Sequence, residues 1–222
     1  MSNNDVVDLN NTALTLTENG YDGKFKQHLN VNEYGMFQSI DVADGTEKVI
    51  IKNTIIDMKD VSLLSSGQGA FLIKKIIDDI NFDLIFENCA VINSNLGNNG
   101  GGFIGHFETG NSDKKATAKI IFKNCYAHIV SFGNSSSNNG GFVGRQCPYK
   151  IYIYNCYVYI EDSSNYSVGF VSSSLNNVYI YNSISILKNS NSKAYTNSTG
   201  KLTLTNCYTN LNQSLDGSTT DT

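Results

Sequence analysis

The carboxylates of this sequence are its first candidates for chemistry, because a glycoside hydrolase needs two of them on either side of the scissile bond. The acidic pair Asp78-Asp79, followed by Asp83, is the best match in the chain. A solvated turn explains the same cluster more simply, since charged side chains are mostly exposed. We therefore predict no catalytic carboxylate pair.

The histidines and glycines do not form a recognisable site either. His28, His106 and His128 are not linked by any His-x-x-x-His spacing or by a Ser/His/Asp order. The glycine pairs lack the Gly-Lys-Ser/Thr ending of a phosphate-binding loop. We predict that the protein is not an enzyme and that it has no metal site and no cofactor.

The five cysteines follow a pattern that does not indicate a zinc or redox site, because no Cys-x-x-Cys pair occurs. Cys147 lies beside Pro148 and is expected in a loop. Each of the other four directly follows an Asn, and they are Cys89, Cys125, Cys156 and Cys207. We predict that these four are free, buried thiols that fill space as small hydrophobic side chains.

The Asn-Cys pairs belong to a repeat that runs from Val49 toward the C-terminus. Its most regular copy is the segment 151–160, IYIYNCYVYI. The central asparagines are Asn53, Asn88, Asn124, Asn155, Asn182 and Asn206. They are separated by 35, 36, 31, 27 and 24 residues, which is the period of solenoid proteins. The repeat therefore predicts one elongated domain.

Side chains alternate with a period of two on both sides of each Asn, but the phase changes there. Positions two and four residues before the Asn are apolar in every copy, whereas positions one, three and five residues after it form the inward set. This set includes Asn93 in the second copy. A bend at the Asn explains the change, because Asn tolerates left-handed backbone angles. We predict two short strands that meet at this corner, with the asparagines stacked from coil to coil.

A second motif lies between the corners and predicts a third strand in each coil. It comprises the segments 69–72, 101–105, 140–144 and 168–171, each with a Phe after glycine or alanine. The Phe is expected in the core, and the glycines allow a tight turn. Because each coil has the same side-chain register, successive coils should pair in parallel. An antiparallel sandwich is the less favoured alternative, since it does not need an identical corner in every repeat.

The segment Gly140-Gly-Phe-Val-Gly144, followed by Asn155-Cys156-Tyr157, resembles the GLUG repeat, as does 101–105 followed by 120–127. The resemblance covers roughly residues 49 to 211. It implies a right-handed parallel β-helix of the kind found in bacterial surface proteins and in proteins of large DNA viruses. We therefore expect an all-β, right-handed parallel β-helix of about five to six coils with three short strands per coil. Residues 1–45 form an irregular N-terminal cap, 46–211 the repeats, and 212–222 a polar tail.

Tyrosines gather on two outward faces of the predicted helix. The face before the corner carries Tyr152, Tyr154, Tyr179 and Tyr181, and the face after it carries Tyr126, Tyr157 and Tyr208. Stacked aromatic residues stabilise neighbouring strands, which is one explanation of both groups. The other is an interaction surface, because exposed aromatic patches often mark interfaces.

The overall charge and hydropathy exclude several classes of partner. A net charge of −4 and a pI near 5.3 argue against nucleic acid. No apolar run is long enough for a membrane span or for the core of a signal peptide. We therefore expect a virion or host-cytoplasm location, with the cell surface by a non-classical route as the alternative.

Three hypotheses about function follow. The first is a structural protein that spaces or joins other subunits, most consistent with a minor virion or capsid component whose partners are capsid proteins. The second is an adhesin-like or carbohydrate-binding module, with glycans as partners. The third is a polysaccharide-cleaving β-helix enzyme.

Overall fold

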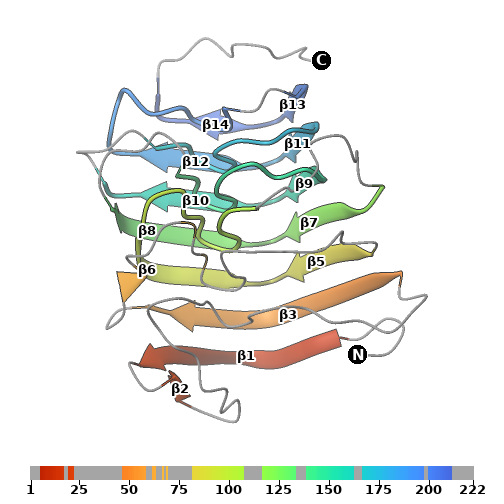
Figure 1. Ribbon diagram of the computed structural model, residues 1–222, viewed down its shortest axis with the longest axis vertical. Coiled ribbons are helices and arrows are strands. Elements are labelled where there is room, and N and C mark those ends of the chain that lie inside the picture. Colours follow the sequence, from red (N-terminus) through yellow and green to blue (C-terminus); the bar gives the residue numbers. More distant parts are fainter. Residues whose placement is uncertain are drawn as a thin grey trace.

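The computed structural model describes residues 6–17, 20–22, 47–58, 62–63, 67, 69, 82–107, 117–133, 139–162, 167–197 and 200–211. These residues form strands, turns and bridges, and no helix occurs among them. The strands stack one above another from the N-terminal to the C-terminal end of the molecule (Figure 1). The chain is a parallel β-helix, as the repeat predicts.

Each full coil contributes two strands that meet at a corner, and these strands form two faces. The first face consists of β3 (Lys48–Asp57), β5 (Asp83–Glu87), β7 (Lys119–Lys123), β9 (Lys150–Tyr154), β11 (Val178–Tyr181) and β13 (Leu202–Thr205). The second face consists of β6 (Ala90–Leu96), β8 (Tyr126–Phe132), β10 (Tyr157–Ile160), β12 (Ile184–Leu187) and β14 (Tyr208–Thr209). The two faces are joined through β3, which runs through its corner without interruption and pairs with both β5 and β6. All of these neighbours are parallel.

The corner asparagines adopt the left-handed conformation that the phase change predicts. Their φ angles lie between 49° and 53° in all six coils. Each side-chain amide donates to the Oδ1 of the Asn one coil earlier, at 3.1 to 3.2 Å, from Asn88 to Asn206. The asparagines thus form a continuous ladder along one edge of the β-helix, and the predicted bend and stacking are confirmed.

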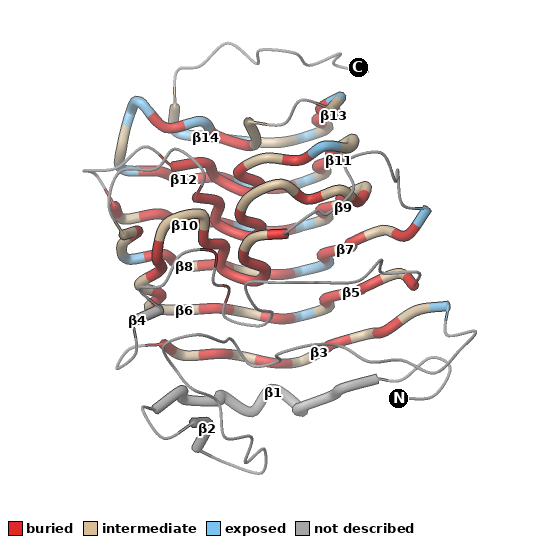
Figure 2. Tube along the Cα trace, viewed as in Figure 1, coloured by how far each residue is buried: buried red, intermediate tan, exposed pale blue. Residues whose placement is uncertain are grey.

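The core is a narrow column between the faces, and buried residues alternate along the strands of the first face from β3 to β13 (Figure 2). Phenylalanines fill its centre. Phe86 and Phe122 of the first face stack at a centroid distance of 5.1 Å. Phe103, Phe142 and Phe170 pack beside them from the third side at 4.9 and 5.0 Å from one another. The predicted core position of these phenylalanines is confirmed.

The predicted inward positions after the corner are correct in most coils but wrong in the second. Asn93 has a φ of 58° and is only partly buried, while Ser94 and Leu96 point into the core. The pairing of β6 with β8 shifts at this point, so a β-bulge inserts one residue and reverses the alternation. The side chain of Asn93 instead donates to Asp57 Oδ1 at 2.9 Å.

The third side of each coil is shorter than a regular strand. The segments that begin near Gly69, Gly101, Gly140 and Val168 pair only through isolated parallel bridges. The reason is close packing, which leaves the glycine side of the coil no room for side chains. A Cβ on Gly141 would collide with the carbonyl oxygen of Gly169 and with Val158.

The N-terminal segment contributes a further rung. Strand β1 (Val6–Thr17) pairs in parallel with β3, and β2 (Gly20–Asp22) pairs antiparallel with β1. A short strand, β4 (Ser62–Leu63), pairs with β6. The predicted C-terminal tail 212–222 lies outside the described residues.

Candidate interaction surface

Among the described residues, those best suited to chemistry are not brought together. Asp83 forms an ion pair with Lys119 at 3.8 Å and accepts the Lys119 backbone N–H at 2.9 Å, so it has a structural partner. His106 Nε2 lies 3.0 Å from Gln146 Oε1, and His128 lies on a different face. Asp78, Asp79 and His28 are outside the described residues. Within the described residues, no three His, Cys, Asp or Glu side chains are grouped to hold a metal ion.

All five cysteines are free thiols. Cys89, Cys125 and Cys156 are buried, as the sequence predicts, and Cys207 is partly exposed because no further coil covers it among the described residues. Cys147 lies between β8 and β9, outside the strands as predicted, and it is fully buried in the core. Burial raises the pKa of the Cys147 thiol to about 12, and burial likewise raises the pKa of Cys125.

The position after the corner Asn does more than fill space. In every coil its side chain donates to the carbonyl of the residue just before the Asn, at 2.7 to 3.3 Å. The donor is a hydroxyl in Thr54 and Ser183 and a thiol in the cysteines. In two coils the side chain also accepts a backbone N–H from the coil before, as Cys156 and Ser183 do. The column therefore requires a small side chain that both donates and accepts, a signal visible in the sequence as Thr, Cys or Ser.

Four of the predicted tyrosines form a compact group on the first face. Tyr152 and Tyr179 stack at 4.7 Å between ring centroids, and Tyr154 and Tyr181 stack at 5.0 Å, with ring planes inclined by 8° in both pairs. The two pairs are adjacent, since Tyr152 and Tyr154 lie 6.3 Å apart. Burial, with the neighbouring Tyr181, raises the pKa of Tyr154, so its hydroxyl remains protonated at neutral pH.

The same face carries lysines that the tyrosine pattern alone did not reveal. Three outward rows run along it, at one, three and five residues before each corner Asn. The outer rows hold six lysines and two carboxylates, a net charge of +4 in a chain of net charge −4. The lysines are Lys48, Lys52, Lys119, Lys123, Lys150 and Lys201, and the carboxylates are Asp83 and Glu87. The central row is apolar or aromatic and holds Ile50, Ile85, Ile121, Tyr152, Tyr179 and Thr203.

The tyrosines of the second face are less continuous than predicted. Tyr126 and Tyr157 stack at 5.2 Å. Tyr208 is separated from them by Ile184, because the pairing runs from Tyr157 to Ile184 to Tyr208. The alignment also missed Tyr159, which stacks on His128 at 5.3 Å.

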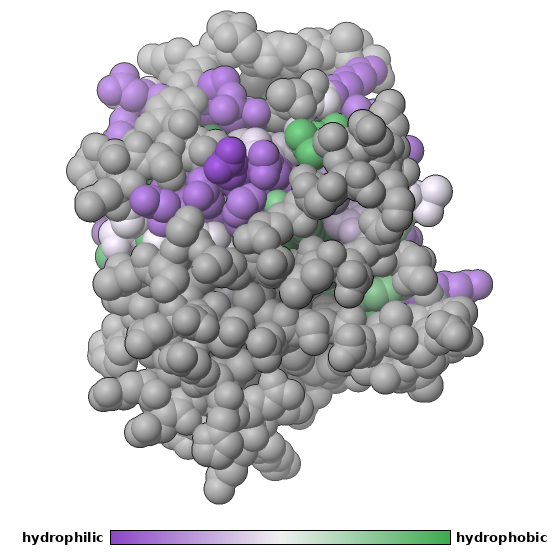
Figure 3. Space-filling model, viewed as in Figure 1, coloured by the Kyte–Doolittle hydropathy of each residue, from purple (hydrophilic) through white to green (hydrophobic). Residues whose placement is uncertain are grey.

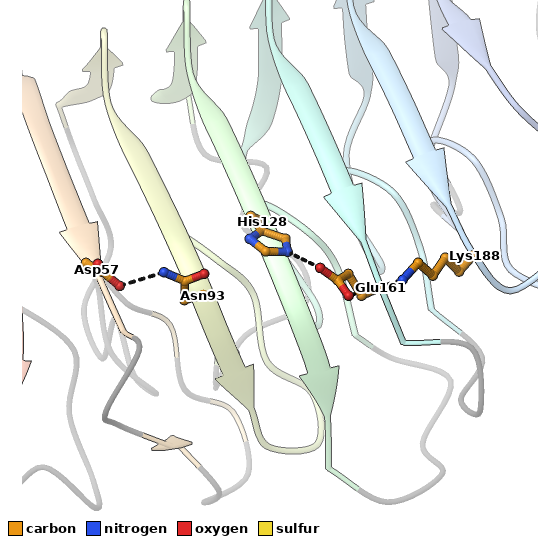
Figure 4. Close-up of polar contacts among 5 residues, drawn as sticks. All are labelled: Asp57, Asn93, His128, Glu161 and Lys188. Carbon is orange, nitrogen blue, oxygen red and sulfur yellow. Dashed lines mark hydrogen bonds and ion pairs between the residues drawn. The ribbon is translucent and has the colours of Figure 1, made fainter.

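A row of polar contacts crosses the second face near the strand ends (Figure 4). Glu161 bridges two coils: its carboxylate lies 2.8 Å from His128 Nε2 and accepts from Lys188 Nζ at 3.1 Å. These hydrogen bonds from His128 and Lys188 lower the pKa of Glu161. The bond to Glu161 raises the pKa of Lys188, whose ammonium also lies 5.9 Å from the Tyr159 ring. Glu161 and Lys188 both lie six residues after their corner Asn, whereas His128 lies four residues after its own, so alignment on the corner Asn does not bring His128 together with the other two.

Figure 3 shows one side of the molecule. Hydrophilic residues gather there over the C-terminal coils, with only small hydrophobic patches between them. In the part of the chain that the structure describes, no helix could cross a membrane.

Comparisons of the chain with protein-family models, with characterised proteins and with solved structures found no significant match. The Asn ladder and the parallel pairing of the faces from β3 onward therefore carry the classification. On this evidence, the chain is a parallel β-helix with a lysine-bordered tyrosine face.

Proposed function

We propose that the chain is a non-enzymatic structural protein that spaces or joins other protein subunits. The observation that carries this proposal is the first face, on which outward side chains remain in register over six coils. Strand spacing of about 4.8 Å repeats the same contacts along a stiff solenoid. A partner that lies along this face meets a long and regular surface.

We further propose that the protein is a minor virion or capsid component of a large DNA virus. The support is the resemblance of 101–105 and 140–144, with their following Asn corners, to GLUG repeats. The expected location is the virion or the host cytoplasm, and the expected partners are capsid proteins.

The stacking of the tyrosines favours a protein partner over a glycan. A sugar ring packs against the exposed face of an aromatic ring. Here Tyr152 and Tyr179 cover one face of each other, and so do Tyr154 and Tyr181. Each ring therefore has at most one face left for a sugar.

Mass spectrometry of purified virus particles tests the proposal. The chain should be found in particles after protease and salt washing, and cross-linking of intact particles should join lysines of the first face to another subunit. A protein that stays in the infected-cell lysate and never sediments with particles contradicts the virion role. Cross-links that form only within the chain contradict the joining role.

A further inference from the structure

The C-terminal half of the first face differs in charge from its N-terminal half. Both carboxylates of the face, Asp83 and Glu87, lie on β5. From β7 onward the outer rows contain lysines but no carboxylate. Lys119 and Lys150 are direct neighbours in the parallel pairing, and like charges in such a pair repel each other.

No described carboxylate forms an ion pair with the lysines that surround the tyrosines. Within the described residues, no carboxylate lies within ion-pair distance of Lys123, Lys150 or Lys201. Lys123 and Lys201 are exposed. Glu87 pairs in register with Lys123, yet the two side chains form no ion pair.

The tyrosine hydroxyls add hydrogen-bond donors to this positive patch. Asn177 donates its side-chain amide to the Tyr179 hydroxyl at 3.2 Å, so the proton of that hydroxyl is directed to another acceptor. An ammonium group has three donors and no acceptor, and a phenol has one donor. The group formed by Lys123, Lys150, Lys201 and the four tyrosines of the first face, here called the donor patch, therefore suits a ligand rich in acceptor oxygens.

The middle of the face suits apolar side chains. The central row continues from the isoleucines Ile85 and Ile121 into Tyr152 and Tyr179. The two outer rows are four residues apart along each strand, about 13 Å at the rise of a β-strand. Each lysine row thus lies roughly 6 to 7 Å from the central row, within reach of an Asp or Glu side chain on a chain that follows that row.

We propose that the donor patch binds an extended acidic segment of a partner protein. The segment lies along the central row, packs its apolar side chains on Ile121 and Tyr152, and places its carboxylates over the lysines. This inference rests on the proposed joining function and specifies the chemistry of the partner.

A protein segment fits this surface better than other polyanions. The isoleucines of the central row would remain uncovered under a polysaccharide, which brings few apolar groups. Nucleic acid would gain from the lysines, but the chain as a whole is acidic, and its net charge repels a phosphate backbone.

Selection from a random 12-residue peptide library displayed on phage tests the inference, with the full chain as bait. The variant Lys123→Ala/Lys150→Ala/Lys201→Ala serves for counter-selection. A control variant, Arg145→Ala/Lys188→Ala/Lys193→Ala, removes the same charge elsewhere. Enriched peptides are then synthesised, and their binding is measured by fluorescence anisotropy at two salt concentrations.

Enriched peptides should carry net negative charge together with apolar residues, and higher salt should weaken their binding. The donor-patch variant should bind them at least about tenfold more weakly, the sum expected for three surface ion pairs, whereas the control variant should bind as the native chain does. The inference is overturned if the enriched peptides are neutral or basic, or if no peptide is enriched. It is also overturned if both triple variants lose the same amount of affinity for the peptides. It is also overturned if a single-stranded DNA oligonucleotide displaces the peptides and binds more tightly. Each of these outcomes leaves the particle test of the proposed function unaffected.

Discussion

The backbone N–H of Cys156 donates to the hydroxyl of Ser183 at 3.0 Å, across the corner between two coils. In the preceding pair of coils, Cys125 donates its N–H to the sulfur of Cys156 at 3.4 Å. Serine and cysteine therefore perform the same two hydrogen-bonding roles in this column. This equivalence changes what a substitution there should do.

Cys125→Ser should change the free energy of unfolding by no more than about 1 kcal/mol. A buried hydroxyl without a partner would be costly, but here it replaces a thiol that already donates to the Lys123 carbonyl at 3.3 Å. Cys125→Leu should cost about 1–3 kcal/mol through overpacking. Urea unfolding of the three proteins measures both effects. A serine variant as unstable as the leucine variant would show that the column is selected for sulfur rather than for a donor.

The sequence was sufficient to predict the corner, because the phase change at each Asn has only one simple geometric explanation. It failed at Asn93, where the spacing of apolar residues does not reveal the inserted residue, and Ser94 takes the inward place. It placed Cys147 correctly outside the strands, beside Pro148, but did not reveal that this residue is completely buried. The tyrosine pairs were predictable from the repeat register. The contact of Glu161 with His128 was not, since His128 lies two positions nearer to its corner Asn than Glu161 does.

Asn124→Ala should destabilise the protein by about 2–5 kcal/mol. The alanine would have to adopt a φ near 52°, which costs about 1–2 kcal/mol for a residue with a Cβ. It would also break the ladder bonds to both Asn88 and Asn155, each worth about 0.5–1.5 kcal/mol. Asn124→Gly should avoid the backbone cost but should still lose both ladder bonds. Asn206→Ala should be less destabilising than Asn124→Ala, because it breaks a single ladder bond. Chemical unfolding of these variants checks the order, and equal losses at 124 and 206 would contradict a continuous ladder.

Gly141→Ala should prevent stable folding or cost more than about 3 kcal/mol, beyond ordinary overpacking. The added Cβ would collide with the Gly169 carbonyl oxygen, which belongs to the backbone and cannot move alone. Gly133→Ala is the matched control, because its Cβ would lie 3.2 Å from the nearest atom, the Cα of Gly97. Circular dichroism and thermal unfolding compare the two variants. Similar melting temperatures would mean that the coils separate more easily at Gly141 than the structure indicates.

The Glu161 carboxylate should make stability depend on acid pH. Its pKa is lowered in the folded state by His128 and Lys188, so its contribution is complete above the ordinary value of about 4.5 and is lost as the pH falls through the lower folded value. Glu161→Gln should therefore lower stability above about pH 4.5 and flatten the decline below that pH. Unfolding midpoints of both proteins between pH 3 and 7 provide the test, and parallel curves would show that the bridge contributes nothing.

Thiol labelling of the native protein should be fast at one cysteine and slow at four. Cys207 is partly exposed, whereas Cys89, Cys125, Cys147 and Cys156 are buried. The reactive species is the thiolate, and burial raises the pKa of Cys147 from 9.0 to about 12. Because the folded pKa is the higher one, the contribution of this thiol to stability is complete below about pH 9 and is lost as the pH rises toward about 12. Cys147→Ala should accordingly show a weaker alkaline loss of stability than the native chain. Mass spectrometry of protein labelled at neutral pH, before and after unfolding, identifies the modified positions. Fast native labelling at Cys125 would mean that this position faces outward and that the strand register after the corner is shifted by one residue.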